Sequence, residues 1–203
     1  MVKTLPNILS VLRIVLAPVF LVMYLQPEIV WRSLSIAVFA TAAVTDFFDG
    51  YIARTYHAES SSGIFLDPLA DKLLTISGFI CLPYLSPNIF GWIPVGLIIL
   101  RDIGTTFLRL WADYHNREMK TRYSAKVKTM IQMLFLYIVL LMGVFSMSTI
   151  ELGQVCRLTL ESPVMTWLLW AVAVLTVYTG IEYVVVNRFF WGNNSAWTQS
   201  KGS

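Results

Sequence analysis

Four aspartates lie within a 26-residue stretch of the sequence and are spaced as metal ligands would be. The stretch reads Asp46-x2-Asp49-Gly50-x2-Ala53-Arg54-x8-Gly63-x3-Asp67-x3-Asp71. Residues three or four apart share a helix face, so each aspartate pair would point the same way on its own helix. Carboxylates without histidine or cysteine suit a hard divalent cation such as Mg²⁺ or Mn²⁺, and four of them exceed what one Mg²⁺ usually takes. The spacing therefore favours two bridged metal ions, an arrangement that clamps phosphate esters.

The flanks of this stretch are strongly apolar, reading AVFATAAV before it and LLTISGFI after it. An ionised side chain at membrane depth costs roughly 2.5–3.5 kcal/mol, so four uncompensated carboxylates would cost on the order of 10 kcal/mol. Bound cations would offset that cost. Gly50, Ala53 and Gly63 are small enough to let a bulky ligand approach the backbone.

The composition is that of a membrane protein. The 203 residues are 57% hydrophobic and 13% charged, whereas soluble domains are about 45–50% apolar and about 25% charged. A net charge of +3 is too small to indicate a nucleic-acid partner. The two cysteines, Cys81 and Cys156, lie in or beside apolar segments and are expected to be buried thiols without a metal or disulfide pattern.

Six apolar runs are long enough to cross a hydrocarbon core of about 30 Å. They predict an all-α integral membrane protein of six transmembrane helices near residues 6–26, 33–55, 63–85, 90–112, 126–148 and 164–187. We expect one membrane domain over residues 1–190 and a flexible cytoplasmic tail over residues 191–203. Gly78 and Gly104, taken alone, are expected to serve helix packing, the usual role of small residues in membrane helices.

The distribution of Lys and Arg predicts the orientation, because short cytoplasmic loops are enriched in both. The connections after the first, third and fifth helices carry only Arg32 and Arg157. The opposite side carries Lys3, Arg54, Arg117, Lys120, Arg122, Lys126, Lys128, Arg188 and Lys201. Both termini are therefore predicted to be cytoplasmic, and the site between the second and third helices lies in the cytoplasmic half, within reach of soluble reactants.

The whole motif resembles the signature of the CDP-alcohol phosphotransferases, D-x2-D-G-x2-A-R-x8-G-x3-D-x3-D, at every fixed position. The resemblance implies a six-helix membrane enzyme, often a homodimer, that transfers a phosphatidyl group from a CDP-linked lipid to an alcohol and releases CMP. It implies that Asp46, Asp49, Asp67 and Asp71 bind two divalent metals and that Asp71 is also the general base. It further implies that Gly50, Ala53, Arg54 and Gly63 line the pocket for cytidine and diphosphate.

A second polar region runs from Arg101 to Gln132. Arg101 and Arg109 lie inside an apolar helix and need an anionic partner, which could be Asp102 or the phosphate of an acceptor. Lys126 and Lys128 follow in the next connection, where cations are often topology determinants or contacts to anionic membrane lipids. If the acceptor is phosphorylated, all four cations are candidates to hold its phosphate, Lys126 and Arg101 first.

The runs Pro6–Arg13, Phe65–Lys72 and Lys126–Thr129 are similar to bacterial phosphatidylglycerophosphate synthases. This likeness implies CDP-diacylglycerol and sn-glycerol 3-phosphate as substrates and the bacterial cytoplasmic membrane as the location. The same chemistry with inositol phosphate, serine or phosphatidylglycerol as acceptor is an alternative. A divalent-cation transporter is a more distant one, because it gives no role to Gly50, Ala53 and Arg54. A non-catalytic scaffold does not explain the aspartates.

Overall fold

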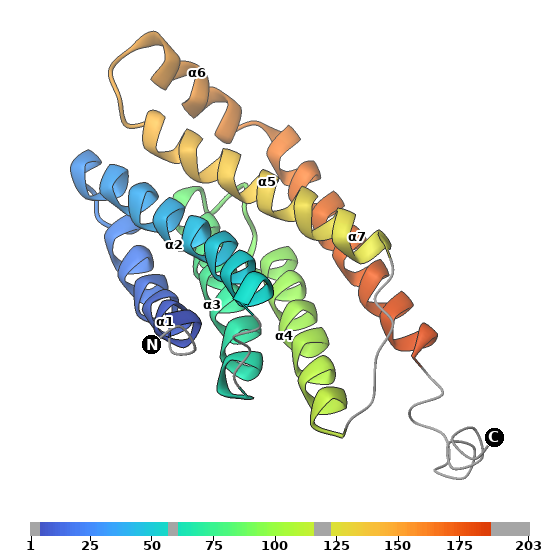
Figure 1. The fold of residues 1–203 in the computed structure, drawn as a ribbon. Helices are drawn as coiled ribbons and strands as arrows, with labels where there is room; N and C mark the ends of the chain where they lie inside the picture. Colours follow the sequence, from blue (N-terminus) through green and yellow to red (C-terminus); the bar gives the residue numbers. More distant parts are fainter. Residues whose placement is uncertain (1–4, 57–60, 116–122, 188–203) are drawn as a thin grey trace, which may run out of the picture.

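The computed structural model describes residues 5–56, 61–115 and 123–187, and these residues form an all-helical bundle (Figure 1). Within those ranges, the structure does not describe the side chains of residues 5–7, 46–56, 61–65, 67 and 123–126. The described residues form seven helices: α1 Leu5–Tyr24, α2 Ile29–Tyr56, α3 Ser61–Leu85, α4 Trp92–Tyr114, α5 Tyr123–Phe145, α6 Glu151–Leu160 and α7 Pro163–Val186.

Six of these helices match the six predicted segments, with every end within about four residues. The seventh, α6, was not predicted, because its ten residues include charged and polar side chains and are too short to cross a membrane. It packs on α5 and α7 and buries Gly153, Cys156 and Leu160. The structure also corrects the start of α5: Tyr123 to Lys128, expected partly as a loop, already belong to the helix.

Successive long helices alternate in direction. In Figure 1, α1, α3 and α5 run upward in the view, whereas α2, α4 and α7 run downward. By length and composition, two helices in the described part of the chain could cross a membrane, α5 over Val127–Phe145 and α7 over its whole length. The apolar parts of α1 and α2, Ile8–Tyr24 and Ile29–Thr45, are shorter. The chain is therefore a helical protein of the membrane type.

Aromatic side chains join α1, α2 and α5 in the core. The ring of Phe39 lies 4.9 Å from that of Phe20 and 5.5 Å from that of Tyr137, measured between centroids. The hydroxyl of Tyr24 donates a hydrogen bond to the carbonyl of Leu140 at 3.0 Å. Such ring pairs add about 0.5–1.5 kcal/mol to the burial of their area.

The two glycines singled out in the sequence differ in their surroundings. A Cβ at Gly78 would lie 2.8 Å from Cδ2 of Leu136, so α3 and α5 approach closely there and the predicted packing role is confirmed. A Cβ at Gly104 would meet no described atom within 4 Å. Gly104 is therefore not a packing contact in the part of the chain that the structure describes.

The two arginines on the predicted outer side are both bound to helix ends. Arg32 Nε donates to the carbonyl of Tyr24, the last residue of α1, at 3.0 Å. Arg157 Nη2 donates to the carbonyl of Ser146, just after α5, at 2.8 Å. Carbonyls at a helix C-terminus lack intrahelical donors and carry partial negative charge. These two cations therefore have a local structural role.

Candidate active site

Helices α2 and α3 carry the four aspartates of the motif. Asp46 and Asp49 lie on α2, and Asp67 and Asp71 lie on α3. The prediction that each pair lies on one helix is therefore confirmed. Gly50, Ala53 and Arg54 follow on α2, and Gly63 lies in the first turn of α3. Of the four aspartate side chains, that of Asp71 is described. No three His, Cys, Asp or Glu groups gather among the side chains that the structure describes, which leave out Asp46, Asp49 and Asp67.

Asp71 presents a partly open carboxylate. Its side chain is 40% exposed, and its Oδ2 lies 3.3 Å from Nζ of Lys72. One turn later the hydroxyl of Thr75 donates to the backbone carbonyl of Asp71 at 3.0 Å and lies 3.6 Å from Sδ of Met133 on α5. Thr75 is buried and thus links the turn that bears Asp71 to α5. The carboxylate itself stays open to a ligand.

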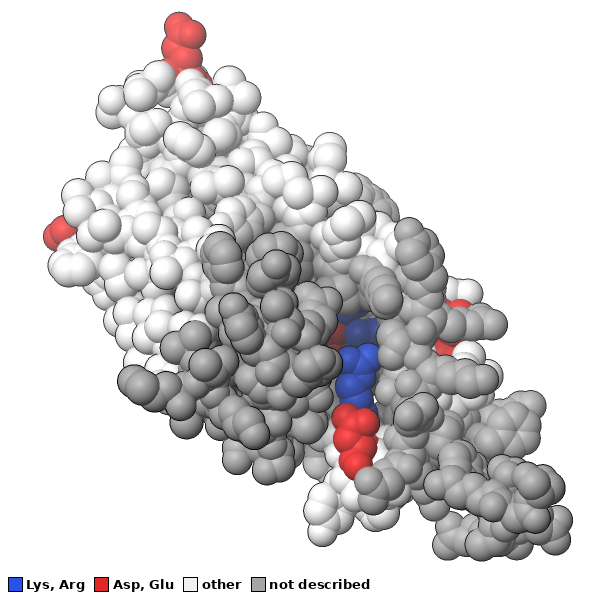
Figure 2. Space-filling model, viewed as in Figure 1, with Lys and Arg blue, Asp and Glu red and all other residues white. Residues whose placement is uncertain are grey.

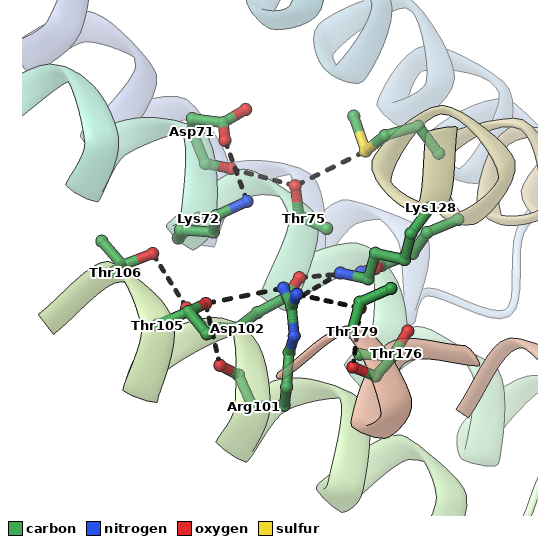
Figure 3. A network of polar contacts seen from close by, with 12 residues as sticks. Asp71, Lys72, Thr75, Arg101, Asp102, Thr105, Thr106, Lys128, Thr176 and Thr179 are labelled. Atoms are coloured by element: carbon green, nitrogen blue, oxygen red, sulfur yellow. Dashed lines mark hydrogen bonds and ion pairs between the residues drawn. The ribbon is translucent and has the colours of Figure 1, made fainter. Parts of the chain in front are cut away.

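A second polar cluster, which we call the Asp102 cluster, joins α4 and α5 (Figure 3). Asp102 Oδ1 accepts a hydrogen bond from Lys128 Nζ at 2.6 Å and another from Arg101 Nη1 at 3.0 Å. Asp102 Oδ2 accepts from Gln132 Nε2 at 2.9 Å. The side chains are 4% exposed for Asp102, 1% for Lys128 and 14% for Arg101. One buried carboxylate thus holds two cations in place.

The Asp102 cluster keeps a positive charge, because two cations share one carboxylate. Lys72, the partner of Asp71, lies near enough to Asp102 and Lys128 for their charges to interact. In Figure 3, Asp71 and Lys72 of α3 lie to the upper left of Arg101 in the view, Thr75 lies above it, and Lys128 lies to its right. The described end of the carboxylate motif and the cation cluster are therefore neighbours. The cations suit a ligand that carries phosphates, and the neighbouring carboxylate suits a divalent metal ion.

Helix α7 completes the surroundings of Arg101. Arg101 Nη2 donates to the hydroxyl of Thr179 at 3.0 Å, and that hydroxyl donates to the carbonyl of Thr176 at 3.0 Å. A Cβ at Gly180 would lie 2.8 Å from Cγ of Arg101. The sequence reasoning missed Thr179 and Gly180. The sequence signal that could have indicated them is a threonine followed by a glycine within an apolar helix.

The structure brings together two of the four predicted phosphate-binding cations. Arg101 and Lys128 meet at Asp102, whereas Arg109 lies two turns further along α4, about 12 Å along the helix axis. Arg109 is exposed and Lys126 is in the first turn of α5, with its side chain outside the description. On the face shown in Figure 2, the described Lys and Arg atoms gather in one recess with acidic atoms beside it, and most of the described surface is uncharged.

Comparisons with known proteins show the family of this chain. The sequence pattern of the family described as CDP-alcohol phosphatidyltransferase matches residues 3–178. A CDP-diacylglycerol–glycerol-3-phosphate 3-phosphatidyltransferase of Rickettsia typhi is 34% identical over 181 residues, which cover 89% of this chain and 95% of the relative. The protein of the same name from Rickettsia felis is 35% identical over 181 residues, covering 89% and 93%.

A relative from Mycobacterium tuberculosis carries a similar name. The probable phosphatidylglycerophosphate synthase of Mycobacterium tuberculosis is 34% identical over 186 residues, which cover 90% of this chain and 81% of the relative. The family pattern spans the carboxylate motif on α2 and α3 as well as the Asp102 cluster. The chain therefore belongs to the CDP-alcohol phosphatidyltransferase family.

Proposed function

We propose that this protein transfers the phosphatidyl group of CDP-diacylglycerol to sn-glycerol 3-phosphate, giving phosphatidylglycerophosphate and CMP. The observation that carries the proposal is the complete carboxylate motif on α2 and α3 next to a cluster with net positive charge centred on Asp102. The motif suits transfer from a diphosphate, and the cluster suits an acceptor that carries its own phosphate. The names of relatives that match most of the chain support this pair of substrates.

In this reaction the hydroxyl oxygen of the acceptor attacks the β-phosphorus of CDP-diacylglycerol. The bond between that phosphorus and the CMP oxygen breaks, and CMP leaves. Asp71 takes the proton of the attacking hydroxyl as general base. Its exposed carboxylate, steadied by Lys72 and by the turn that Thr75 holds, supports this role. Most of the remaining catalysis is the positioning of two substrates that bind side by side.

The donor set of the motif fits two divalent cations. CDP-alcohol phosphatidyltransferases generally use divalent metals, and four carboxylates on neighbouring helices provide the oxygen ligands that Mg²⁺ and Mn²⁺ prefer. Asp46, Asp49, Asp67 and Asp71 would hold the ions. When bound, they would neutralise the charge of the diphosphate. Gly50, Ala53, Arg54 and Gly63, which lie on the same two helices, would form the pocket for cytidine and diphosphate.

The acceptor phosphate is assigned to the cations of α4 and α5. Arg101 is more exposed than Lys128 and is our first choice for direct contact, together with Lys126. Lys128 is buried and bound to Asp102, so it would add positive charge to the site without touching the phosphate. Arg109 would act further out along α4. A guanidinium binds phosphate through paired hydrogen bonds, which makes arginine well suited to this task.

In the bacterial cytoplasmic membrane, α1 to α5 and α7 would form the six crossings, with both termini and the site on the cytoplasmic side. The alternating helix directions support this topology. Residues 1–190 would form the membrane domain and residues 191–203 a cytoplasmic tail. The family resemblance further leads us to propose a homodimer, which the mass of the detergent-solubilised protein would test.

Release of CMP tests the reaction and the acceptor together. Protein purified in detergent is given CDP-diacylglycerol, Mg²⁺ or Mn²⁺, and glycerol 3-phosphate, inositol phosphate, serine or phosphatidylglycerol in parallel. We expect CMP release with glycerol 3-phosphate alone. Release with another acceptor only would overturn the assignment of glycerol 3-phosphate. No release with any acceptor would refute the transferase activity.

A further inference from the structure

Arg101 is fixed by contacts from two helices, and α7 provides the less obvious half of them. On α4, Asp102 accepts from Nη1 at 3.0 Å, and the hydroxyl of Thr105 lies 3.5 Å from the same nitrogen. On α7, the hydroxyl of Thr179 accepts from Nη2 at 3.0 Å. Because this hydroxyl donates its own hydrogen to the carbonyl of Thr176 at 3.0 Å, it is oriented to accept from the guanidinium.

Gly180 provides the space in which the stem of Arg101 lies. A Cβ at this position would be 2.8 Å from Cγ and 3.2 Å from Nε of Arg101. Both values are shorter than ordinary van der Waals separations between side chains. Any residue larger than glycine would therefore push the arginine away from Thr179 and Asp102.

These contacts leave part of the guanidinium for a ligand. A guanidinium has five N–H donors. Asp102, Thr105 and Thr179 account for three of them, and Nε is buried without a hydrogen-bond acceptor in the part of the chain that the structure describes. Nε–H and one N–H on Nη2 remain. The Arg101 side chain is 14% exposed, and a guanidinium N–H without a protein acceptor can donate to a phosphate oxygen.

We propose that Thr179 and Gly180 on α7 are positioning residues, which orient the guanidinium of Arg101 so that it binds the phosphate of the acceptor. The inference rests on the proposed function, because it takes that phosphate as the ligand. It adds a role for α7 in acceptor recognition, although neither residue touches the acceptor. Thr179 sets the direction of the guanidinium, and Gly180 allows its approach to α7.

Three substitutions and one control test the proposal. Gly180→Ala inserts a methyl group against the stem of Arg101, and Thr179→Val removes the acceptor hydroxyl but keeps the shape. Thr179→Ser keeps the hydroxyl. Gly104→Ala is the matched control, because it adds the same methyl group to α4 where no described atom of another element lies within 4 Å. Apparent unfolding temperatures identify variants that fail to fold.

The readout is the KM for each substrate, measured by CMP release. Gly180→Ala and Thr179→Val should each raise the KM for glycerol 3-phosphate by about tenfold, the size expected when a hydrogen bond to a charged group is lost. The KM for CDP-diacylglycerol should stay within about twofold, and Thr179→Ser and Gly104→Ala should resemble the unsubstituted protein. A folded Gly180→Ala or Thr179→Val variant with an unchanged KM for glycerol 3-phosphate would overturn the positioning role alone. An unsubstituted protein that does not use glycerol 3-phosphate would overturn the proposed function and this inference with it.

Discussion

Asp102→Asn should destabilise the protein strongly, because Asp102 is the described counter-charge for the buried ammonium of Lys128. The two groups are 2.6 Å apart and at most 4% exposed. At an effective dielectric constant of about 20, two unit charges at this distance attract by about 6 kcal/mol. Desolvation offsets part of this, and removing one partner of a buried pair typically costs about 3–5 kcal/mol. We expect a loss in that range.

The partner variant should behave differently. Lys128→Met removes the ammonium but leaves Asp102 bound to Arg101 at 3.0 Å and to Gln132 at 2.9 Å. Its expected loss is about 1.5–3 kcal/mol, the value of one hydrogen bond to a charged group. The double variant has no ammonium at position 128, so no buried charge is left unpaired there. Its loss should therefore be at least about 2 kcal/mol smaller than the sum of the two single losses.

Two buried cysteines provide the assay. Cys81 and Cys156 are free thiols inside the folded protein, so a thiol-reactive fluorogenic dye reports their exposure on heating. For a chain of this size about 1 kcal/mol corresponds to about 2–4 °C, so Asp102→Asn should lower the apparent unfolding temperature by about 6–20 °C. A shift below about 2 °C, or strictly additive effects in the double variant, would refute the role assigned to this carboxylate.

Three further predictions follow from the site and the core. Asp71→Asn should lower turnover at least about 10²-fold with little change in unfolding temperature, because it removes the general base; turnover within about threefold of the unsubstituted protein would exclude that role. Chelation with EDTA should abolish CMP release, and added Mg²⁺ or Mn²⁺ should restore it; undiminished release in EDTA would contradict the two-metal proposal. Gly143→Ala should destabilise by about 1–3 kcal/mol, because the new methyl group would collide with the hydroxyl of Tyr24 and displace it from its hydrogen bond. Gly96→Ala, whose methyl group would meet none of the described neighbours within 4 Å, is its control in the thiol assay, and equal unfolding temperatures for the two variants would count against this account of Gly143.

The long helices could be predicted from the sequence because membrane-length apolar runs leave few other folds. Their ends agree with the prediction within about four residues. Helix α6 could not be predicted in this way, because it is short and mixed in polarity. It is stabilised by packing on α5 and α7, through residues such as Cys156 and Leu160, and that contact is tertiary.

The candidate site was predictable as far as local spacing reaches. The two aspartate pairs each need one helix, and the helices formed as expected. The partners of Arg101 were only partly foreseen, because Asp102 is adjacent in sequence but Thr179 is 78 residues away. Likewise, the bond between Lys128 and Asp102 joins residues 26 apart, and no local pattern encodes it. Helix packing determines which buried cations share a carboxylate.

The most direct test of the account follows the acceptor into the lipid product. Purified protein is incubated with CDP-diacylglycerol, Mn²⁺ and glycerol 3-phosphate labelled in its glycerol carbons. The lipids are then extracted, and their masses are measured by mass spectrometry. We predict one labelled lipid with the mass of phosphatidylglycerophosphate, formed in equal amount to CMP. Labelled glycerol that stays in the aqueous phase while CMP accumulates would contradict the claim that glycerol 3-phosphate is the acceptor.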